Sequence, residues 1–172
     1  DFCEYYNLTF SITNIESYIK SEDFKTMYGV NDVFQLDKSA YYRIFAVEYL
    51  MQSGNTDDTI YLDCDTLIFN DIHRISNIKS KNLLLAVKEE TADNSLVRLS
   101  MKENNLESYF NSGVMFFKTS NRKLYKDLRS AIKLCTEHDQ SKIFLQDQCV
   151  LNIAFNEKWT NIPKTFNLQT HR

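Results

Sequence analysis

Glycine and proline are scarce in this sequence, which has three glycines and one proline among 172 residues. The scarcity matters because several phosphate-binding and nucleophile motifs depend on glycine. Neither G-x-G-x-x-G, G-x-x-x-x-G-K-[ST] nor G-x-S-x-G occurs. If the protein handles a nucleotide, its phosphates therefore need a source of positive charge other than a glycine-rich loop.

An excess of positive charge is also missing. The formal net charge is −3 and the pI is about 5.6, and lysines and arginines are scattered among acidic residues. Domains that bind nucleic acid usually concentrate lysine and arginine in a patch or stripe. We therefore expect no nucleic-acid partner.

Cysteines with metal-site spacing are absent as well. The four cysteines show no C-x-x-C pair and no nearby set of histidines, so a zinc site is not expected. Cys64 and Cys149 lie in apolar runs, where a buried reduced thiol is the usual state, and we expect a reducing, cytoplasmic compartment. No apolar run has the length of a membrane span, and no signal-peptide pattern opens the sequence. A peripheral association with the membrane would have to come from termini outside this sequence.

The order of apolar and charged segments predicts an α/β fold in one domain, residues 1–172. Hydrophobic residues make up 43% and charged residues 25%, as in ordinary globular proteins. Strand-like segments alternate with helix-like ones, which favours a sandwich with a largely parallel sheet. Ligands bind such sheets beyond the carboxyl ends of the strands. We expect strands within 7–15, 59–69, 82–87 and 109–117, a helix or turns over 16–29, and helices over 39–53, 120–138 and 145–155.

Asp63 and Asp65 interrupt the apolar stretch "TIYLDCDTLIF". In an extended segment, residues two apart face the same side at a spacing of roughly 6–7 Å. Two carboxylates so placed near a buried strand repel each other and resist desolvation, and a divalent cation such as Mg²⁺ or Mn²⁺ would resolve that conflict. Such a cation could in turn neutralise a diphosphate. The alternative is that the two aspartates simply turn the chain.

Arg43 lies in the apolar helix "SAYYRIFAVEYL" without an acidic neighbour at helical spacing. A buried guanidinium needs an anionic partner, and this one must come from elsewhere in the fold. The partner could be a phosphate or an aspartate of the segment 63–65. An ordinary tertiary ion pair, or a side chain that reaches solvent, is the alternative.

Two further polar groups interrupt apolar segments. Asn111 and Gly113 lie in the strand-like run "YFNSGVMFF", where a glycine indicates either close approach of another group or a β-bulge. Asp147 and Gln148 open the helix over 145–155. Asp147 there could simply cap the helix, and the Gln148 amide oxygen could stabilise a nearby cationic centre.

Taken in order, five segments resemble glycosyltransferase family 8, and its bacterial lipopolysaccharide-type members in particular. The segments are "SAYYRIFAVEYL", with its arginine, "IYLDCDTLIFNDI", with the D-x-D motif, "YFNSGVMFF", "LQDQCVLNIAFNEKW" and "NIPKTFN". Together they span residues 38–167. Their order and spacing make the resemblance far more specific than any single motif.

The resemblance implies a GT-A fold and transfer of a hexose, glucose or galactose, from a UDP-sugar with retention at the anomeric carbon. The acceptor would be a glycan or glycolipid such as a lipopolysaccharide or capsule precursor. The implied roles are Mn²⁺ or Mg²⁺ ligation by Asp63 and Asp65, donor binding by Arg43, Asp63, Asn111, Gly113 and Glu90, and a place at the reacting centre for Asp147 and Gln148.

The sequence departs from the family pattern at three points. Cys149 replaces the second acid of D-Q-D, the first βα unit is not evident, and no C-terminal H-x-x-G-x-K-P-W segment follows. We therefore expect the chain to be part of a longer domain. The alternative to an enzyme is a non-catalytic protein of the same fold that binds a nucleotide sugar or acts as a scaffold.

Overall fold

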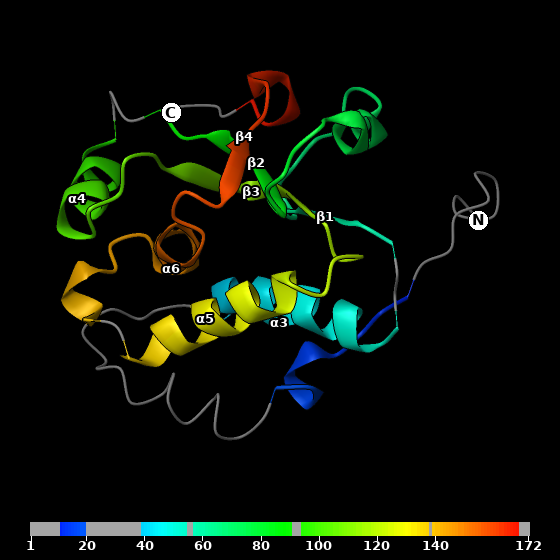
Figure 1. Cartoon of the computed structure of the whole chain (residues 1–172), viewed down its shortest axis with the longest axis horizontal. Coiled ribbons are helices and arrows are strands. Elements are labelled where there is room, and N and C mark those ends of the chain that lie inside the picture. Colours follow the sequence, from blue (N-terminus) through cyan, green and yellow to red (C-terminus); the bar gives the residue numbers. More distant parts are fainter. Residues whose placement is uncertain (1–10, 20–38, 55–56, 91–93, 138, 169–172) are drawn as a thin grey trace.

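The computed structural model describes residues 11–19, 39–54, 57–90, 94–137 and 139–168. Within them, a four-stranded sheet has three helices against one face and two short 3-10 helices against the other (Figure 1). The predicted α/β class is confirmed. None of the helices in the described ranges is long and apolar enough to cross a membrane.

The sheet contains β1 (Thr59–Leu62), β2 (Leu84–Lys88), β3 (Phe110–Phe117) and β4 (Trp159–Asn161) in the order β1-β3-β2-β4. β3 pairs with both β1 and β2 in antiparallel fashion, and only β2 and β4 are parallel. The predicted predominance of parallel pairing is therefore wrong for the described sheet. β3 is buried on both faces along most of its length, and a continuous apolar run carries no information about strand direction.

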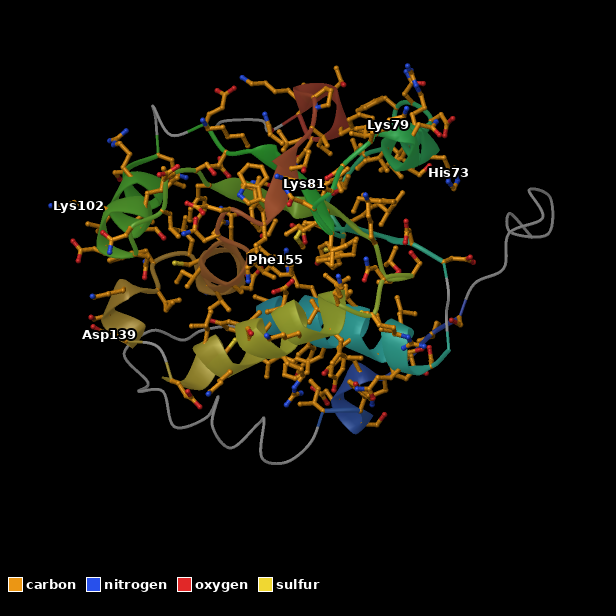
Figure 2. The ribbon with its side chains drawn as sticks, viewed as in Figure 1. His73, Lys79, Lys81, Lys102, Asp139 and Phe155 are labelled. Carbon is orange, nitrogen blue, oxygen red and sulfur yellow. The ribbon has the colours of Figure 1, made fainter. Side chains whose placement is uncertain are left out.

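Three helices pack on one face of the sheet: α3 (Ser39–Gln52), α5 (Leu124–Glu137) and α6 (Gln146–Ala154). Their apolar residues meet alternate residues of β2 and β3 in the main core. Phe155, just after α6, is fully buried between the helices and the sheet and packs edge-on against Phe117 (Figure 2). α3 ends before Gly54, whose φ of +87° suits glycine, so the predicted bounds of this helix are confirmed to within a residue.

The opposite face is covered by η2 (Ile72–Asn77) and η4 (Lys164–Phe166). Ile75 of η2 packs with Leu85, Val87 and Phe116 in a second, smaller core. Neither η2 nor α4 (Ser95–Glu103) was predicted, because both are short; η2 has six residues and begins after the cap Asp71, and α4 has nine and begins after the cap Asn94. The remaining described elements are η1 (Ile15–Ser17) and η3 (Gln140–Lys142).

Two predicted strands end early or are missing. β1 stops at Leu62, and the second apolar run of "TIYLDCDTLIF" is exposed, with Phe69 at 89%. Cys64 is accordingly exposed rather than buried. Residues 11–14 form no strand, and 7–10 lie outside the described residues. Residues 16–19 form the end of η1 and a turn, and the rest of the segment 16–29 also lies outside the described part of the chain.

Candidate functional site

Arg43 joins three elements of the fold at the end of β1. Its Nη2 lies 3.1 Å from Oδ1 of Asp63, which follows β1, and its Nε lies 3.1 Å from Oδ2 of Asp147 in α6. Nη1 donates to the carbonyl oxygen of Ser112 (3.1 Å) and to its hydroxyl (3.2 Å) in β3. Nε also donates to the Ala40 carbonyl, 3.0 Å away. The anionic partner predicted from the segment 63–65 is thus Asp63, and Asp147 is a second one.

Asp63 has two carboxylate oxygens in different surroundings. Oδ1 accepts a hydrogen bond from the hydroxyl of Tyr61 at 2.7 Å, in addition to its contact with Arg43. Oδ2 has no donor among the described residues and points toward Gly113. The backbone N–H of Asp63 donates to the Gly113 carbonyl (2.9 Å), which extends the β1–β3 ladder by one residue. The carboxylate is therefore fixed at the strand end with one oxygen uncommitted.

Gly113 lies at a β-bulge and also allows other groups to approach closely, the two explanations that the sequence suggested for a glycine at this position. A Cβ atom there would lie 3.0 Å from Oδ1 of Asn111 and 3.1 Å from Oδ2 of Asp63, closer than ordinary contacts. β3 also contains a bulge between Phe110 and Met115. These residues pair with Lys88 and Ala86 of β2, so five residue steps along β3 match only two along β2. The bulge and the missing side chain together bring the two polar groups close to each other.

Asn111 is held by three hydrogen bonds. Its Nδ2 donates to Oε2 of Glu89 (2.9 Å), while its Oδ1 accepts from the N–H of Gly113 (2.9 Å) and from Nδ2 of Asn167 (2.8 Å). Because the Gly113 N–H can only donate and a carboxylate can only accept, the amide orientation is fixed. Asn167 follows η4, so the last described segment also reaches the site.

Gln148 is bound to the same network. Its Oε1 accepts from the N–H of Ser112 (3.1 Å) and from the Ser112 hydroxyl (3.3 Å), and its Nε2 approaches Oε2 of Glu89 at 3.4 Å. The amide oxygen, which was predicted to be available for a cationic centre, is already committed to Ser112. The carboxylate beside the Gln148 amide is that of Glu89.

Asp147 is a buried ion-pair partner and does not cap α6. The N-cap of that helix is Leu145, which makes no side-chain cap bond. Burial raises the pKa of Asp147 to about 6, although Arg43 opposes the shift and Asp63 adds to it. Asp147 Oδ2 and Gln148 Oε1 each lie 3.3 Å from the Ser112 hydroxyl, whose single proton can be donated to either oxygen.

Asn152 fixes α6 against β3. Its Oδ1 accepts from the Phe110 N–H at 2.8 Å, and its Nδ2 donates to the Phe110 carbonyl at 2.9 Å. These two bonds satisfy backbone groups where the β2–β3 ladder is interrupted by the bulge. The position of Asp147 and Gln148 relative to β3 is therefore set by a side chain one turn further along the helix.

The remaining two predicted residues lie apart from this network. Glu90 forms an ion pair with Lys164 of η4. Asp65 lies on the turn after β1, is exposed, and makes no hydrogen bond or ion pair with the described residues.

Glu89 is the residue of the network that the sequence analysis missed. Its side chain is 6% exposed, whereas Glu90 is half-buried. Strand alternation contains the signal, because Val87 is buried, Lys88 exposed and Glu89 buried again. A prediction by alternation would have selected the first of the two glutamates.

The charge of the network is negative. Asp63, Glu89 and Asp147 supply three carboxylates, and Arg43 is the guanidinium that pairs with two of them, so the formal charge is −2 when all are ionised. No group of three or more potential metal-ligating His, Cys, Asp or Glu residues occurs in the described ranges. The arrangement favours a cationic or cation-bound ligand.

Known proteins resemble this chain over most of its length. General stress protein A of Bacillus subtilis is 27% identical over 137 residues, which make up 79% of this chain and 47% of that protein. Glycosyltransferase GlyF of Streptococcus pneumoniae is 24% identical over 132 residues, covering 77% of this chain and 30% of that protein. The chain thus spans less than half the length of these curated relatives.

A solved apo structure of the bifunctional glycosyltransferase WbbM has a TM-score of 0.55 with this chain at 18% identity. The similarity covers 78% of this chain and 26% of that one, and it shows a shared fold, in agreement with the predicted GT-A type. The sequence model of glycosyl transferase family 8 matches residues 4–171. The predicted resemblance is confirmed, and the chain belongs to glycosyltransferase family 8.

Proposed function

We propose that this chain forms the donor-binding and catalytic part of a retaining glycosyltransferase that moves a hexose from a UDP-sugar to a glycan acceptor. The observation that carries the proposal is the pairing of Arg43 with both Asp63 of the D-x-D segment and Asp147 of α6. It joins the proposed diphosphate end of the site to the proposed reacting centre. Membership of glycosyltransferase family 8 supports the reaction class.

Asp63 and Asp65 fit a hard divalent cation, Mn²⁺ or Mg²⁺, by the chemistry of their donor atoms. Oδ2 of Asp63 has no donor among the described residues, and the exposed Asp65 carboxylate is likewise uncommitted there. When bound, such an ion would supply charge neutralisation for the leaving diphosphate. Each nitrogen atom of Arg43 already contacts a group within the protein, namely Asp63, Asp147 or Ser112, so we assign neutralisation of the diphosphate to the cation.

Asn111 and Gly113 are the proposed residues of the donor-sugar site, with Glu89 in the role predicted for Glu90. The missing side chain at Gly113 leaves the Asp63 and Asn111 oxygens within reach of each other and of a ligand. Glu89 holds the amide groups of Asn111 and Gln148 through one oxygen, Oε2, and its buried charge favours a positive partner.

At the reacting centre, the carboxylates of Asp147 and Glu89 would stabilise positive charge that develops on the sugar ring. Both are buried, and both are fixed by hydrogen bonds before a ligand arrives, which is what electrostatic preorganisation requires. Gln148 is best placed to position Ser112 and Glu89 rather than to donate its oxygen to the sugar. No covalent nucleophile is needed in this account, in keeping with Cys149 at the position of the family's second acid.

The acceptor and location are further parts of the proposal. A lipopolysaccharide or capsule precursor is the proposed acceptor class, and the reaction would take place on the cytoplasmic side, free in solution or at the membrane surface. Cys135 and Cys149 support a reducing compartment because both are buried free thiols. Burial raises the pKa of Cys135 to about 12, which keeps it an unreactive thiol.

A non-catalytic nucleotide-sugar-binding or scaffold protein is the second candidate. It is favoured by the absence of a third acidic or histidine ligand beside Asp63 and Asp65 within the described residues. It predicts that UDP binds, with or without Mn²⁺, but that no UDP-sugar is consumed.

Turnover of radiolabelled UDP-glucose and UDP-galactose by the full-length protein with Mn²⁺ distinguishes these candidates. We expect slow Mn²⁺-dependent consumption of at least one donor, and its loss in Asp65→Asn, since that change removes a proposed ligand. Asp71→Asn is the matched control because Asp71 is an exposed acid that caps η2. A wild-type protein that binds UDP with Mn²⁺ but consumes no donor would support the non-catalytic candidate instead.

A further inference from the structure

Tyr61 contacts both members of the Arg43–Asp63 ion pair. Its hydroxyl donates to Oδ1 of Asp63 at 2.7 Å, and the Arg43 guanidinium lies over its ring, 4.8 Å from the centroid. Tyr61 precedes Asp63 by two residues on β1, so strand alternation directs both side chains to the same face.

The contact distinguishes the two oxygens of Asp63. Oδ1 receives the Tyr61 hydroxyl and Nη2 of Arg43, while Oδ2 receives no donor from the described residues. An arginine beside a carboxylate usually forms two parallel bonds, one to each oxygen. Here the guanidinium makes a single bond to Asp63 through Nη2, while its Nη1 is bound to Ser112 and its Nε to Asp147.

We infer that Tyr61 is a positioning residue that keeps Asp63 Oδ2 available to a divalent cation by holding Oδ1 and preventing a bidentate pair with Arg43. The inference rests on the proposed metal-binding role of Asp63. Without the hydroxyl, the carboxylate can rotate so that both oxygens face the guanidinium. Arg43 would then compete with the cation for the same oxygen atoms.

The test uses Tyr61→Phe, which removes the hydroxyl and keeps the ring under Arg43. Free Mn²⁺ is measured by electron paramagnetic resonance during titration of the full-length protein in the presence of UDP. Loss of a group that orients a metal ligand typically weakens metal binding by 10–100-fold, and we expect a change of about tenfold. Tyr42→Phe is the matched control, because the Tyr42 hydroxyl bonds the exposed Glu16 and should leave Mn²⁺ affinity unchanged.

A second pair of variants tests the mechanism. Lysine cannot form a bidentate pair, so Tyr61→Phe should change Mn²⁺ affinity less than twofold when it is introduced into Arg43→Lys. Wild-type Mn²⁺ affinity in Tyr61→Phe would overturn the positioning role while leaving the metal site intact. If Tyr61→Phe still lowers Mn²⁺ affinity tenfold in the Arg43→Lys background, Arg43 does not compete with the cation for Asp63, and that part of the inference is wrong. If the wild-type protein itself binds no Mn²⁺ with UDP present, the metal proposal fails, and the inference fails with it.

Discussion

The Nε atom of Arg43 in α3 lies 3.1 Å from Oδ2 of Asp147 in α6, and both side chains are largely buried. The two residues are far apart in the sequence, and their ion pair joins α3 to α6 near Asp63, the residue that follows β1. Breaking a buried pair by removing one partner leaves an uncompensated charge, which costs about 3–5 kcal/mol. Arg43→Met should therefore lower the free energy of unfolding in urea by about that amount.

Arg74→Met is the control for this change, since Arg74 is exposed on η2 and should contribute less than about 0.5 kcal/mol. The double variant Arg43→Met with Asp147→Asn should recover part of the loss, because the buried carboxylate is then gone. Equal stability of Arg43→Met and the wild-type protein would show that the ion pair does not form.

Asp147 should make stability depend on pH between about 4 and 6. Its pKa rises from an ordinary value of 3.8 to about 6 in the folded protein, chiefly through burial. The folded state therefore binds the proton more tightly, and this contribution is complete below pH 3.8 and is lost as the pH rises through 6. Two pKa units correspond to a free energy on the order of 3 kcal/mol.

The difference between wild type and Asp147→Asn isolates this effect from other carboxylates. Measured by urea unfolding without divalent metal, the wild-type free energy of unfolding minus that of the variant should fall as the pH rises from 4 to 7. A difference that stays constant or increases with pH would show that the Asp147 pKa is not raised.

Glu89 and Glu90 provide a direct comparison of neighbouring acids. Glu89 is buried and bonds Asn111 and Gln148, whereas Glu90 pairs with Lys164 of η4, apart from that network. Glu89→Gln should lower donor turnover by about 10²-fold, the usual effect of removing one preorganised electrostatic group. Glu90→Gln should change it by less than threefold. A larger loss of donor turnover in Glu90→Gln than in Glu89→Gln would instead support Glu90, the residue predicted from the sequence.

Gly113 and Gly54 form another matched pair. An alanine at Gly113 would press against Asp63 Oδ2 and Asn111 Oδ1, while one at Gly54 meets open space but requires an unfavourable φ of +87°. Gly54→Ala should cost about 1–2 kcal/mol of stability without affecting UDP binding. Gly113→Ala should weaken UDP binding in the presence of Mn²⁺. Equal UDP affinity in both variants would contradict the close approach at Gly113.

The sequence predicted α3, α5 and α6, and it singled out several of the polar residues that the structure brings together around Arg43, because those features are local. The helix around Arg43, the D-x-D turn and the Asn111–Gly113 interruption each stand out against apolar neighbours. Strand direction was predicted less well, since β3 is buried on both faces and its pairing with β1 and β2 depends on long-range contacts. The hydrogen bonds of Gln148 could not be predicted from the sequence either, because its partner Ser112 is 36 residues away along the chain.

The anomeric configuration of the released sugar tests the central claim most directly. Proton NMR can follow full-length protein with Mn²⁺ and UDP-α-glucose or UDP-α-galactose, and it identifies the first anomer formed before mutarotation. A retaining transferase predicts the α-anomer of one hexose, formed only with the divalent metal and not by Asp65→Asn. Release of the β-anomer, or no metal-dependent release of either hexose, would contradict the account.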